Sequence, residues 1–568
     1  MRQTALRRAI VTLAATAAVA LLGACTVGPD YRRPEAAVPP AWQTDSYWRL
    51  AQPSHAPISP EWWSAFGDVT LATLETQALA QNQTLAAASA HYAQARATLA
   101  NTRALQVPEV DLAAAGSRFR ISQSRPLTNY ATPTTSTVQN NFQLGPTIDY
   151  DTDLFGRIRR EVEGAVASAQ QSGDDLANAR LVLTTDLATD YFSLRELDAE
   201  IDVLNQSVVL QKKALDYVTT EHDLGSVSGL DVLQQQSLLD STRLQAQLLL
   251  NQRAQYEHAI AALVGVPAPQ FSIDPKVVNL QVPAIPLGLP SDVLQRRPDI
   301  ASAERAMAAA NAQIGVAKAA FFPSLTLTPS IGWEATQFAS LLSAPTLMWT
   351  LGAAVGQVLF DGGRRAANVQ YASEGYKATE ANYRQTVLNA FQQVQDGITG
   401  LSVLDNASQQ SHAAVADSQR LLSLANDRYS GGLVAFLDVI TAQQSLLTSE
   451  RQDVQIHGQQ MTLSVSLVKA LGGGWTDADM ALSGTSIAPQ RNAPEGNAPE
   501  GNARQGSATQ GNTPQGNTPQ GNARQGDMPE GNMPHDNASQ GSAPEANVSP
   551  RNLRPDGKEQ SEAIAHAE

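Results

Sequence analysis

The chain of 568 residues is poor in the residue types that most disulfides, metal centres and catalytic motifs require. It has a single cysteine, Cys25, which excludes an internal disulfide and a cysteine-based zinc site. It has only 8 histidines, and it contains no H-x-x-x-H pair on a helical pattern, no G-x-x-x-x-G-K-[ST] phosphate loop and no G-x-S-x-G nucleophile motif. We therefore expect no enzyme activity, no metal site and no cofactor.

Aromatic and charged residues are also scarce, at 5% and 16% of the chain, whereas Ala, Gln, Leu, Ser and Asn are abundant. This composition favours long helices over compact mixed sheets. Acidic residues exceed basic ones, so that the formal net charge is −15. Because such a charge repels phosphate backbones, a nucleic-acid partner is not expected.

The first 25 residues have the pattern of a bacterial export signal. Three arginines within the first eight residues precede an apolar run over 9–22, which is too short to cross a bilayer comfortably and ends in small residues. Leu22-Gly23-Ala24-Cys25 matches the lipobox, so we expect removal of residues 1–24 and a lipid, with palmitate, on Cys25. An ordinary signal followed by an incidental cysteine is the alternative. Thr26, in place of Asp, favours sorting to the outer membrane.

The composition changes abruptly near the other end of the chain. From about residue 485 onward, variants of Pro-Glu-Gly-Asn-Ala repeat, and no aromatic residue follows Trp475. Such a stretch buries too little apolar area to offset chain entropy. The sequence therefore predicts a disordered tail over 485–568, without a readable function.

Between these ends, the chain repeats itself at a displacement of about 205 residues, and each half is expected to form one structural unit. The matched stretches are 154–157 with 359–362, 230–236 with 437–443, and 262–265 with 470–473.

Each half contains a long helical pattern. Apolar residues advance by threes and fours, from Leu187 to Val208 and again from Val387 to Leu401, which is typical of amphipathic helices in a bundle or coiled coil. In the first half the only break falls at Gly225–Gly229, and the corresponding break is Gly431-Gly432. The roughly 65 residues before the first break would form a helix of about 100 Å. Each half thus predicts a long helical hairpin.

Ahead of each hairpin, the apolar period changes from 3.6 to 2, with a weaker run from Val110 and clearer ones over 142–150, 325–333 and 347–355. Strands of about ten residues with one apolar face match transmembrane β-strands, but a half-buried sheet in water has the same pattern. Open sheet edges are not tolerated in hydrocarbon, and four strands are about half the minimum for a closed barrel. If the strands lie in a membrane, several chains must share one barrel.

Several motifs together resemble a known family, the TolC/OprM-like outer-membrane factors of bacterial tripartite efflux systems, in the NodT-type lipoprotein branch. They extend from Cys25 to Gly474 and include the segments 25–31, 62–68, 296–300, 303–304, 314–317 and 321–325.

The resemblance implies a TolC-like fold in which a membrane β-barrel continues into a long α-helical barrel. It implies a homotrimer whose chains each give four strands to a 12-stranded barrel in the outer membrane, with helices that extend into the periplasm. It also implies a periplasmic adaptor (membrane fusion) protein and an inner-membrane pump, commonly of the resistance-nodulation-division class. The expected domains are 1–24 signal peptide, 25–65 lipidated segment, 66–270 first efflux repeat, 271–295 linker, 296–474 second efflux repeat and 485–568 tail.

The leading functional hypothesis is therefore a passive exit channel for drugs or other small exported compounds. A type I protein-secretion channel is an alternative within the same class. A periplasmic coiled-coil lipoprotein that forms no channel is an alternative from another class, and it leaves the alternating strands unexplained.

The expected gate lies at the two hairpin breaks, where the resemblance assigns constriction roles to Asp231, Asp438 and Tyr429. In a trimer each aspartate would form a ring of three negative charges, which attracts cations. The alternative for Asp231 is a capping box with Ser228. Ala435 occupies the capping position before Asp438, so capping explains that aspartate less well.

Arg296 and Arg297 have two interpretations. They could bind an anionic partner, or they could precede a helix that begins at Pro298 with Asp299 in its first turn. The structural interpretation is favoured.

Overall fold

The structure is a computed structural model. It describes residues 26–35, 38–44, 61–120, 138–278, 281–285, 287 and 290–474. The predicted signal peptide, the lipidation site Cys25 and the predicted tail over 485–568 lie outside the described residues.

The order of elements confirms the duplication, because helix, strand, strand, long helix and returning helix occur twice. The first half contains η1 (Trp62–Phe66), α3 (Val69–Gln81), α4 (Gln83–Ala104), β1 (Glu109–Arg120), β2 (Val138–Thr152), α5 (Arg157–Asp223) and α6 (Gly229–Val264). After η2 (Ala268–Gln270), the second half contains α7 (Pro290–Arg296), α8 (Pro298–Ala319), β3 (Ser324–Ala335), η3 (Phe338–Ser340), η4 (Ala344–Thr346), β4 (Leu347–Gly356), α9 (Arg364–Ser430) and α10 (Phe436–Ala470).

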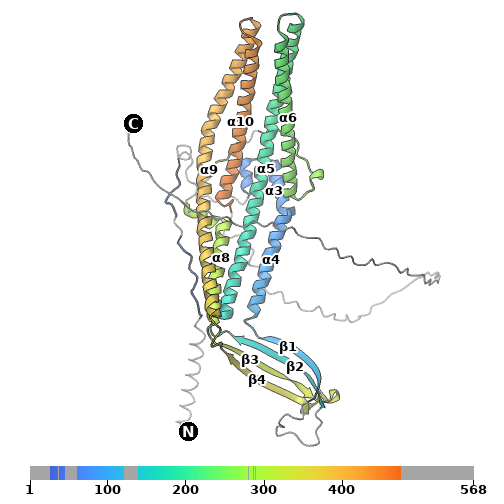
Figure 1. The fold of residues 1–568 in the computed structure, drawn as a ribbon, viewed down its shortest axis with the longest axis vertical. Coiled ribbons are helices and arrows are strands. Elements are labelled where there is room, and N and C mark those ends of the chain that lie inside the picture. Colours follow the sequence, from blue (N-terminus) through green and yellow to red (C-terminus); the bar gives the residue numbers. More distant parts are fainter. Residues whose placement is uncertain are drawn as a thin grey trace, which may run out of the picture. The chain divides into compact units, whose positions relative to one another are not determined.

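The two long helices, α5 and α9, have 67 residues each, which corresponds to about 100 Å at 1.5 Å per residue. They form the predicted hairpins with α6 and α10 (Figure 1). Among the described residues, no helix combines the length and apolar content that a membrane span needs.

An aspartate followed by an N-cap glycine starts both long helices. Asp153 accepts hydrogen bonds from the backbone N–H groups of Ile158 and Arg159, and Asp361 accepts one from that of Arg365. Gly156 and Gly363 hold the N-cap positions with φ of 81° and 92°, in the left-handed region that favours glycine. A side-chain acceptor thus replaces the missing helical partner at each start.

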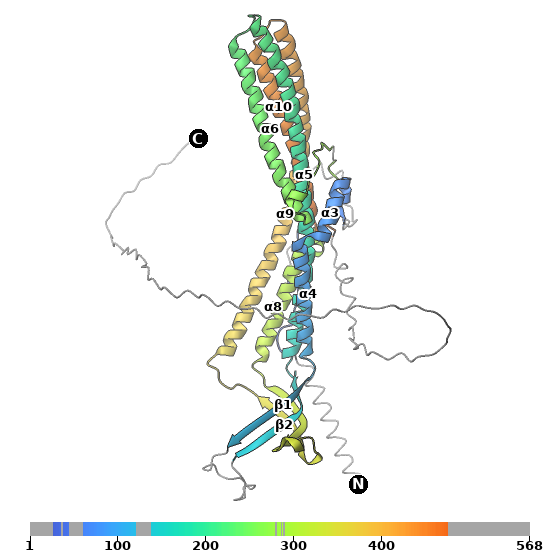
Figure 2. The same cartoon turned by 90° about the vertical axis from the view of Figure 1, so that its right-hand side faces the viewer.

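The four strands form one antiparallel sheet in the order β1-β2-β3-β4, so that both halves contribute to it. The strands meet the helices at the end of the hairpins that is opposite to the α5–α6 and α9–α10 turns (Figures 1 and 2). The four predicted runs are thereby confirmed as strands.

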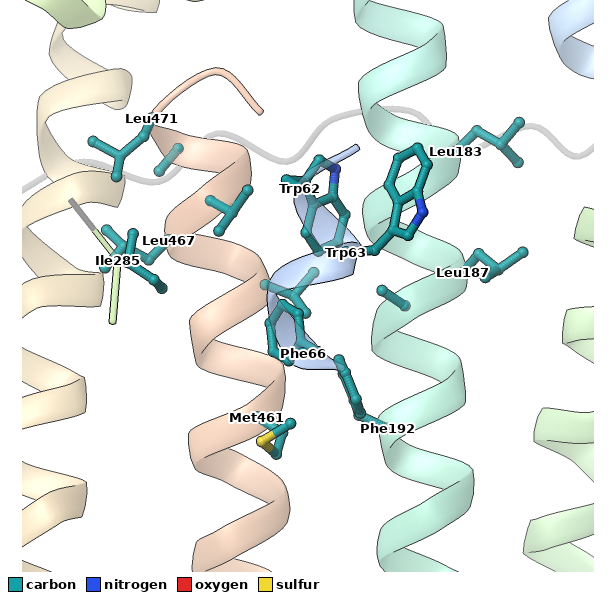
Figure 3. Packing of buried hydrophobic residues seen from close by; sticks show 14 of the residues in the cluster. Trp62, Trp63, Phe66, Leu183, Leu187, Phe192, Ile285, Met461, Leu467 and Leu471 are labelled. Carbon is teal, nitrogen blue, oxygen red and sulfur yellow. The ribbon is translucent and has the colours of Figure 1, made fainter. Parts of the chain in front are cut away.

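An apolar core lies where η1 and α3 pack against α5 and α10. Trp62, Trp63 and Phe66 point into this core beside Phe192 of α5 and Met461 of α10 (Figure 3). Their rings pack edge to face or tilted, with centroids 4.8 to 6.0 Å apart. The cluster joins both halves of the duplication because it contains residues of each.

The N-terminal strap, residues 26–44 where described, fastens these elements from outside. Val27 donates a backbone hydrogen bond to Phe155 at the end of β2, and Asp30 pairs with Arg160 of α5 at 2.8 Å. Farther along, Gln43 exchanges hydrogen bonds with Gln395 of α9. The strap therefore connects the strand–helix junction of the first half to the long helix of the second.

Candidate functional site

One face of the sheet carries a long apolar stretch that crosses all four strands. Residues that are paired across the strands lie on the same face, and Ile331 pairs with Trp349, Pro329 with Leu351. Trp349 and Leu351 expose 74% and 77% of their surface in the single chain. Its apolar stretch consists of Val110, Leu112, Ala114, Leu144, Pro146, Ile148, Tyr150, Leu325, Leu327, Pro329, Ile331, Trp333, Leu347, Trp349, Leu351, Ala353 and Val355. Beyond this stretch the same face carries the polar residues Arg118, Arg120, Asn140 and Thr152. An exposed apolar face of this extent indicates contact with lipid or another apolar surface.

The opposite face is mostly polar or small, with Phe119 and Met348 as exceptions. Glu334 accepts hydrogen bonds from the side-chain amides of Asn141 and Gln143, at 2.9 and 3.1 Å. Gly145 and Gly332 meet face to face there, and a Cβ on Gly145 would lie 2.3 Å from the carbonyl oxygen of Ile331. The two strands cross so closely that neither position admits a side chain.

The two edges of the sheet are open in the single chain. Among the described residues, β1 and β4 each pair on one side only, and every residue of β1 is exposed. The exposure continues into the helices that adjoin these strands, because α4 has no buried residue and Tyr371 of α9 is 84% exposed. The single chain thus offers two long, complementary edges, β1–α4 and β4–α9.

The first tip, residues 224–228 between α5 and α6, is tightly closed. Gly225 adopts the left-handed φ of 77°, and the ring of His222 bonds the carbonyl of Val227 at 3.0 Å. The capping box is present: Ser228 Oγ accepts from the N–H of Leu230, and Asp231 Oδ2 accepts from the N–H of Ser228 at 3.2 Å. The capping interpretation of Asp231 is therefore confirmed as a structural feature.

The second tip, residues 431–435 between α9 and α10, lacks this cap. Ala435 is the N-cap residue of α10 and provides no side-chain hydrogen bond. Asp438 is exposed, and its carboxylate has no hydrogen bond or ion pair with the described residues. Asp231 and Asp438 nevertheless occupy equivalent positions, because each is the third residue of its helix and donates its N–H to the N-cap carbonyl, at 3.1 Å.

Tyr429 lies between the two hairpins. Its ring packs edge to face on Tyr217 of the first hairpin and on Phe436 of its own, with centroids 6.3 and 5.1 Å apart. Burial raises the pKa of Tyr429, and the charges of Tyr217, Glu221 and Asp231 raise it further. The structure thus brings Tyr429 and Asp231 into one electrostatic environment.

Polar contacts also join the hairpins along their length. Gln235 of α6 donates to the carbonyl of Gln211 on α5 and to the side chain of Gln443 on α10. Nearer the base, the guanidinium of Arg451 on α10 pairs with buried Glu200 on α5. These contacts bind the second hairpin to the first at two levels.

Sequence reasoning missed a buried charge cluster at the base of the first hairpin, which we name the Asp198 clasp. The Asp198 side chain, 2% exposed, pairs with Arg195 at 2.8 Å and with Arg253 of α6 at 2.6 Å. Arg253 also donates to the carbonyl of Ile273, and so fastens the loop after α6. A signal was available, since Arg195 and Asp198 directly follow the stripe positions Leu194 and Leu197.

The structural interpretation of Arg297 is confirmed. It precedes α8 as the N-cap residue, with Pro298 at the first helical position. Its guanidinium pairs with Asp299 at 2.6 Å and donates to the carbonyl of Ala470 at the end of α10. Arg297 therefore joins two helix ends and is not available to a partner.

A comparison with protein families finds a match that agrees with the architecture and with the two faces of the sheet. The family described as "Outer membrane efflux protein" matches residues 74–266 and 289–473, one match for each half. The chain belongs to this family. The predicted family resemblance is thus confirmed, and the role that it assigns is that of an efflux channel and not of an enzyme.

Curated relatives from Pseudomonas cover most of the chain. The solvent efflux pump outer membrane protein SrpC of Pseudomonas putida is 31% identical over 464 residues, which span 81% of this chain and 97% of that protein. The pyoverdine export outer membrane protein OpmQ of Pseudomonas aeruginosa is 30% identical over 464 residues, 82% of this chain and 97% of the relative.

Solved structures show the same fold. The outer-membrane channel OprN matches with a TM-score of 0.73 at 28% identity and covers 79% of this chain and 100% of its own. The MtrE channel of Neisseria gonorrhoeae, in its open state, has a TM-score of 0.70 at 27% identity, with coverage of 79% and 98%. The protein is therefore a TolC-like outer-membrane channel component of an efflux pump that extends into the periplasm.

Proposed function

We propose that the protein is the passive exit duct of a tripartite efflux pump and works as a homotrimer. The observation that carries this proposal is the four-stranded sheet with one exposed apolar face and two open edges. Backbone groups at an open edge cannot remain unpaired in hydrocarbon, so β1 of one chain must pair with β4 of the next. Three chains give 12 strands, an even number within the range of outer-membrane barrels.

The test of this proposal is the conductance of the purified protein in planar bilayers, together with its mass in detergent. We expect a trimer that produces discrete conductance steps. A monomer, or a trimer that inserts without conductance steps, would contradict the channel.

A gate at the second tip is the next part of the proposal. Asp438 is exposed and unneutralised by the described residues, so three copies would form a negative ring at the narrow end. The Asp231 carboxylate accepts a hydrogen bond in the capping box, and we expect it to contribute less than Asp438 to cation selectivity. Tyr429 would hold the closed state through its packing on Tyr217.

Conductance of variant trimers tests the gate. Asp438→Ala should weaken cation preference or relieve block by multivalent cations, and Tyr429→Phe should raise the resting conductance if its hydroxyl bridges neighbouring helices. Unchanged selectivity and resting conductance in the double variant Asp231→Ala, Asp438→Ala would exclude an aspartate gate.

Lipidation of Cys25 is proposed from the lipobox, and its neighbour supports it. Thr26 lies against Gly156, and Val27 bonds Phe155, at the end of β2 where a membrane boundary is expected. A lipid on Cys25 would therefore start at the level of the bilayer. Cys25→Ser should abolish palmitate labelling, and persistent labelling would contradict the assignment.

We propose a periplasmic adaptor at the hairpin tips and an inner-membrane pump of the resistance-nodulation-division class as partners. The relatives' names associate those proteins with solvents, toluene, antibiotics and pyoverdine, which supports small exported compounds as the cargo here. Co-purification of an adaptor and a pump after cross-linking in cells is the expected result. If components of a type I secretion system co-purify instead, the exported cargo is protein and not a small compound.

A further inference from the structure

The two hairpins of one chain meet chiefly where α5 packs against α10. This contact lies inside the chain, away from the open edges β1–α4 and β4–α9. Apolar and polar levels alternate along it, and a polar level between apolar ones is where the contact is most sensitive to charge. From the base toward the tips, the facing sets are Phe192 with Met461 (Figure 3), Glu196 with Gly458, Glu200 with Arg451 and Gln455, and Leu204 with Leu447.

The carboxylate of Glu196 lies directly against the backbone of α10. Gly458 is the only glycine of that helix, and it is buried there. A Cβ at this position would overlap the Glu196 carboxylate, so any other residue would push that side chain out of the contact. A glycine inside a helix costs about 1 kcal/mol relative to alanine. Gly458 thus makes room for Glu196 at a position where the helix alone would favour alanine.

Glu196 has no hydrogen bond or ion pair with the described residues, although charged groups surround it. Glu200, one turn farther along α5 and only 3% exposed, accepts from Arg451 Nε at 2.7 Å. Arg451 also donates to Gln245 of α6 at 3.0 Å, so its guanidinium is already bound. The other titratable groups on the surrounding helices, none of which pairs with Glu196, are Arg195 and Asp198 on α5, Arg253 and Glu257 on α6, Glu75 on α3, and Asp453 and His457 on α10.

This environment favours the neutral form of the carboxyl group. Burial raises the pKa of Glu196 from 4.5 to about 7, and the negative charge of Glu200 contributes to the rise. The stability that the contact gives is therefore fully present below pH 4.5 and is lost as the pH rises through about 7. Above that pH, Glu200 repels the ionised carboxylate, which is better solvated outside the contact.

We propose that Glu196 and Gly458 form a proton-controlled latch between the two hairpins of one chain. The protonated carboxyl group lies against Gly458 and holds α10 on α5. The ionised carboxylate moves to solvent, water enters this level, and the second hairpin tilts away from the first toward the tips. The latch does not rest on the proposed channel, because both of its members belong to one chain.

The duplication provides a contrast to this pair. At the equivalent positions, displaced by 207 residues, α9 has Val403 and α6 has Asn251. Neither a carboxylate nor a glycine stands there, and Val403 is 60% exposed in the single chain. The latch therefore belongs to the contact between α5 and α10 and has no counterpart in the other pair of helices.

The distance between the two tips measures the latch in the purified full-length protein. Spin labels are attached to Ser226→Cys and Leu433→Cys in a Cys25→Ser background, and labelled chains are diluted with unlabelled ones so that distances within one chain are read. In the parent, a longer distance should replace a shorter one between about pH 5.5 and about pH 8.5, with a midpoint near 7. Glu196→Gln keeps the shape of the protonated carboxyl group, and it should retain the shorter distance throughout.

Two further variants separate the latch from a general effect of pH. Glu200→Gln should move the midpoint to lower pH by about one unit, because it removes a like charge and frees Arg451. Asp190→Asn is the matched control on the same helix. It removes an acid whose pKa is raised to about 6 but which lies beside α6, so the midpoint should stay unchanged.

Gly458→Ala should give the longer distance at every pH, since the added Cβ takes the place of the carboxylate. If this variant fails to fold, the comparison of Glu196→Gln with Asp190→Asn still decides. The proposal is overturned by a tip distance in the parent that does not change with pH, by a Glu196→Gln protein that titrates like the parent, or by loss of the transition in Asp190→Asn.

Discussion

The two hairpins come from the same duplicated pattern and have equally long leading helices, yet they are fastened differently. The first is held by a capping box at its tip and by the Asp198 clasp at its base. At the equivalent positions, displaced by 207 residues, the second has Ser402, Asp405 and Gln460. Asp405 accepts only from Gln409 of its own helix, at 3.0 Å, among the described residues.

The apolar periodicity that builds the helices is present in both hairpins, whereas buried charged residues occur only in the helices of the first, α5 and α6, and not in α9 or α10. The first hairpin has the stronger local fastening, so we expect it to act as the rigid reference. Beyond the shared apolar core, Arg451, Gln443 and Tyr429 attach the second hairpin to the first. Movement at the periplasmic end should therefore occur mainly in the second hairpin.

The largest effect is expected from the clasp. Asp198→Ala leaves Arg195 buried without a carboxylate and leaves Arg253 with Glu257 alone. Breaking a buried pair in this way costs about 3–5 kcal/mol. Thermal unfolding of the purified protein should show a large fall in the midpoint. The matched variant Asp405→Ala should change stability by less than about 0.5 kcal/mol. Equal losses of stability in Asp198→Ala and Asp405→Ala would contradict the proposed difference between the hairpins.

In the sheet, by contrast, the two halves should behave alike. Leu144 of β2 and Leu351 of β4 occupy equivalent positions on the apolar face. Arginine at either site should cost about 2–4 kcal/mol, if it lies near the bilayer midplane, and should reduce assembly in the outer membrane.

The controls for the sheet are their neighbours on the polar face, Gln143→Arg and Thr350→Arg, which should assemble at nearly normal levels. Membrane fractionation followed by a non-denaturing gel measures the assembled protein. A loss in the polar-face variants equal to that in Leu144→Arg and Leu351→Arg would mean that the assigned faces are wrong.

A pH-dependent difference comes from α3, whose place in the second half is taken by the shorter α7. Glu75 of α3 is fully buried without a partner among the described residues, and burial raises its pKa from 4.5 to about 9. The folded chain thus holds this proton more tightly than the unfolded chain. The resulting stability is fully present below pH 4.5 and is lost as the pH rises through about 9.

Glu75→Gln should flatten this dependence, so that the unfolding midpoint falls less between about pH 5 and pH 9 than in the parent protein. Glu374→Gln on α9, an exposed carboxylate paired with Lys377, serves as the control and should leave the slope unchanged. An identical slope in Glu75→Gln and the parent would contradict the buried-acid assignment.

The smallest effect is expected from an exchange of caps. Ser228→Ala removes the side-chain acceptor at the first tip, and Ala435→Ser offers one at the second, each worth about 1 kcal/mol. Hydrogen exchange of the amides in the first turn of α6 should become about fivefold faster, and that in α10 correspondingly slower. Exchange that stays unchanged in both turns would show that capping does not distinguish the tips.

Much of the fold was predictable because it follows from local patterns. The stripes that start at Leu187 and Val387 predicted the helices, and the alternation over 325–333 and 347–355 predicted the strands. The Ser228–Asp231 cap was readable because its two residues are only three apart. The glycines at 225 and 229 and at 431 and 432 sufficed to place both hairpin breaks.

The parts that escaped prediction depend on distant pairs. Asp198 meets Arg253 across 55 residues, and Tyr31 donates to Glu304 across 273, so no local pattern announces either contact. No sequence pattern singles out Glu75, and only packing shows its burial. The gate roles of Asp231, Asp438 and Tyr429 stay predictions, because they depend on copies of the chain that meet around the axis.

The identical length of α5 and α9 limits how such a protein can change. Both helices start after a strand of the same sheet, so their equal count of 67 residues brings the two tips to one level. Insertion of a heptad into one hairpin alone would raise its tip by about 10 Å above the other. A partner that docks on tips at one level would then meet tips at two different heights. Insertions and deletions in these helices should therefore be tolerated only as matched pairs, one in each half of the chain.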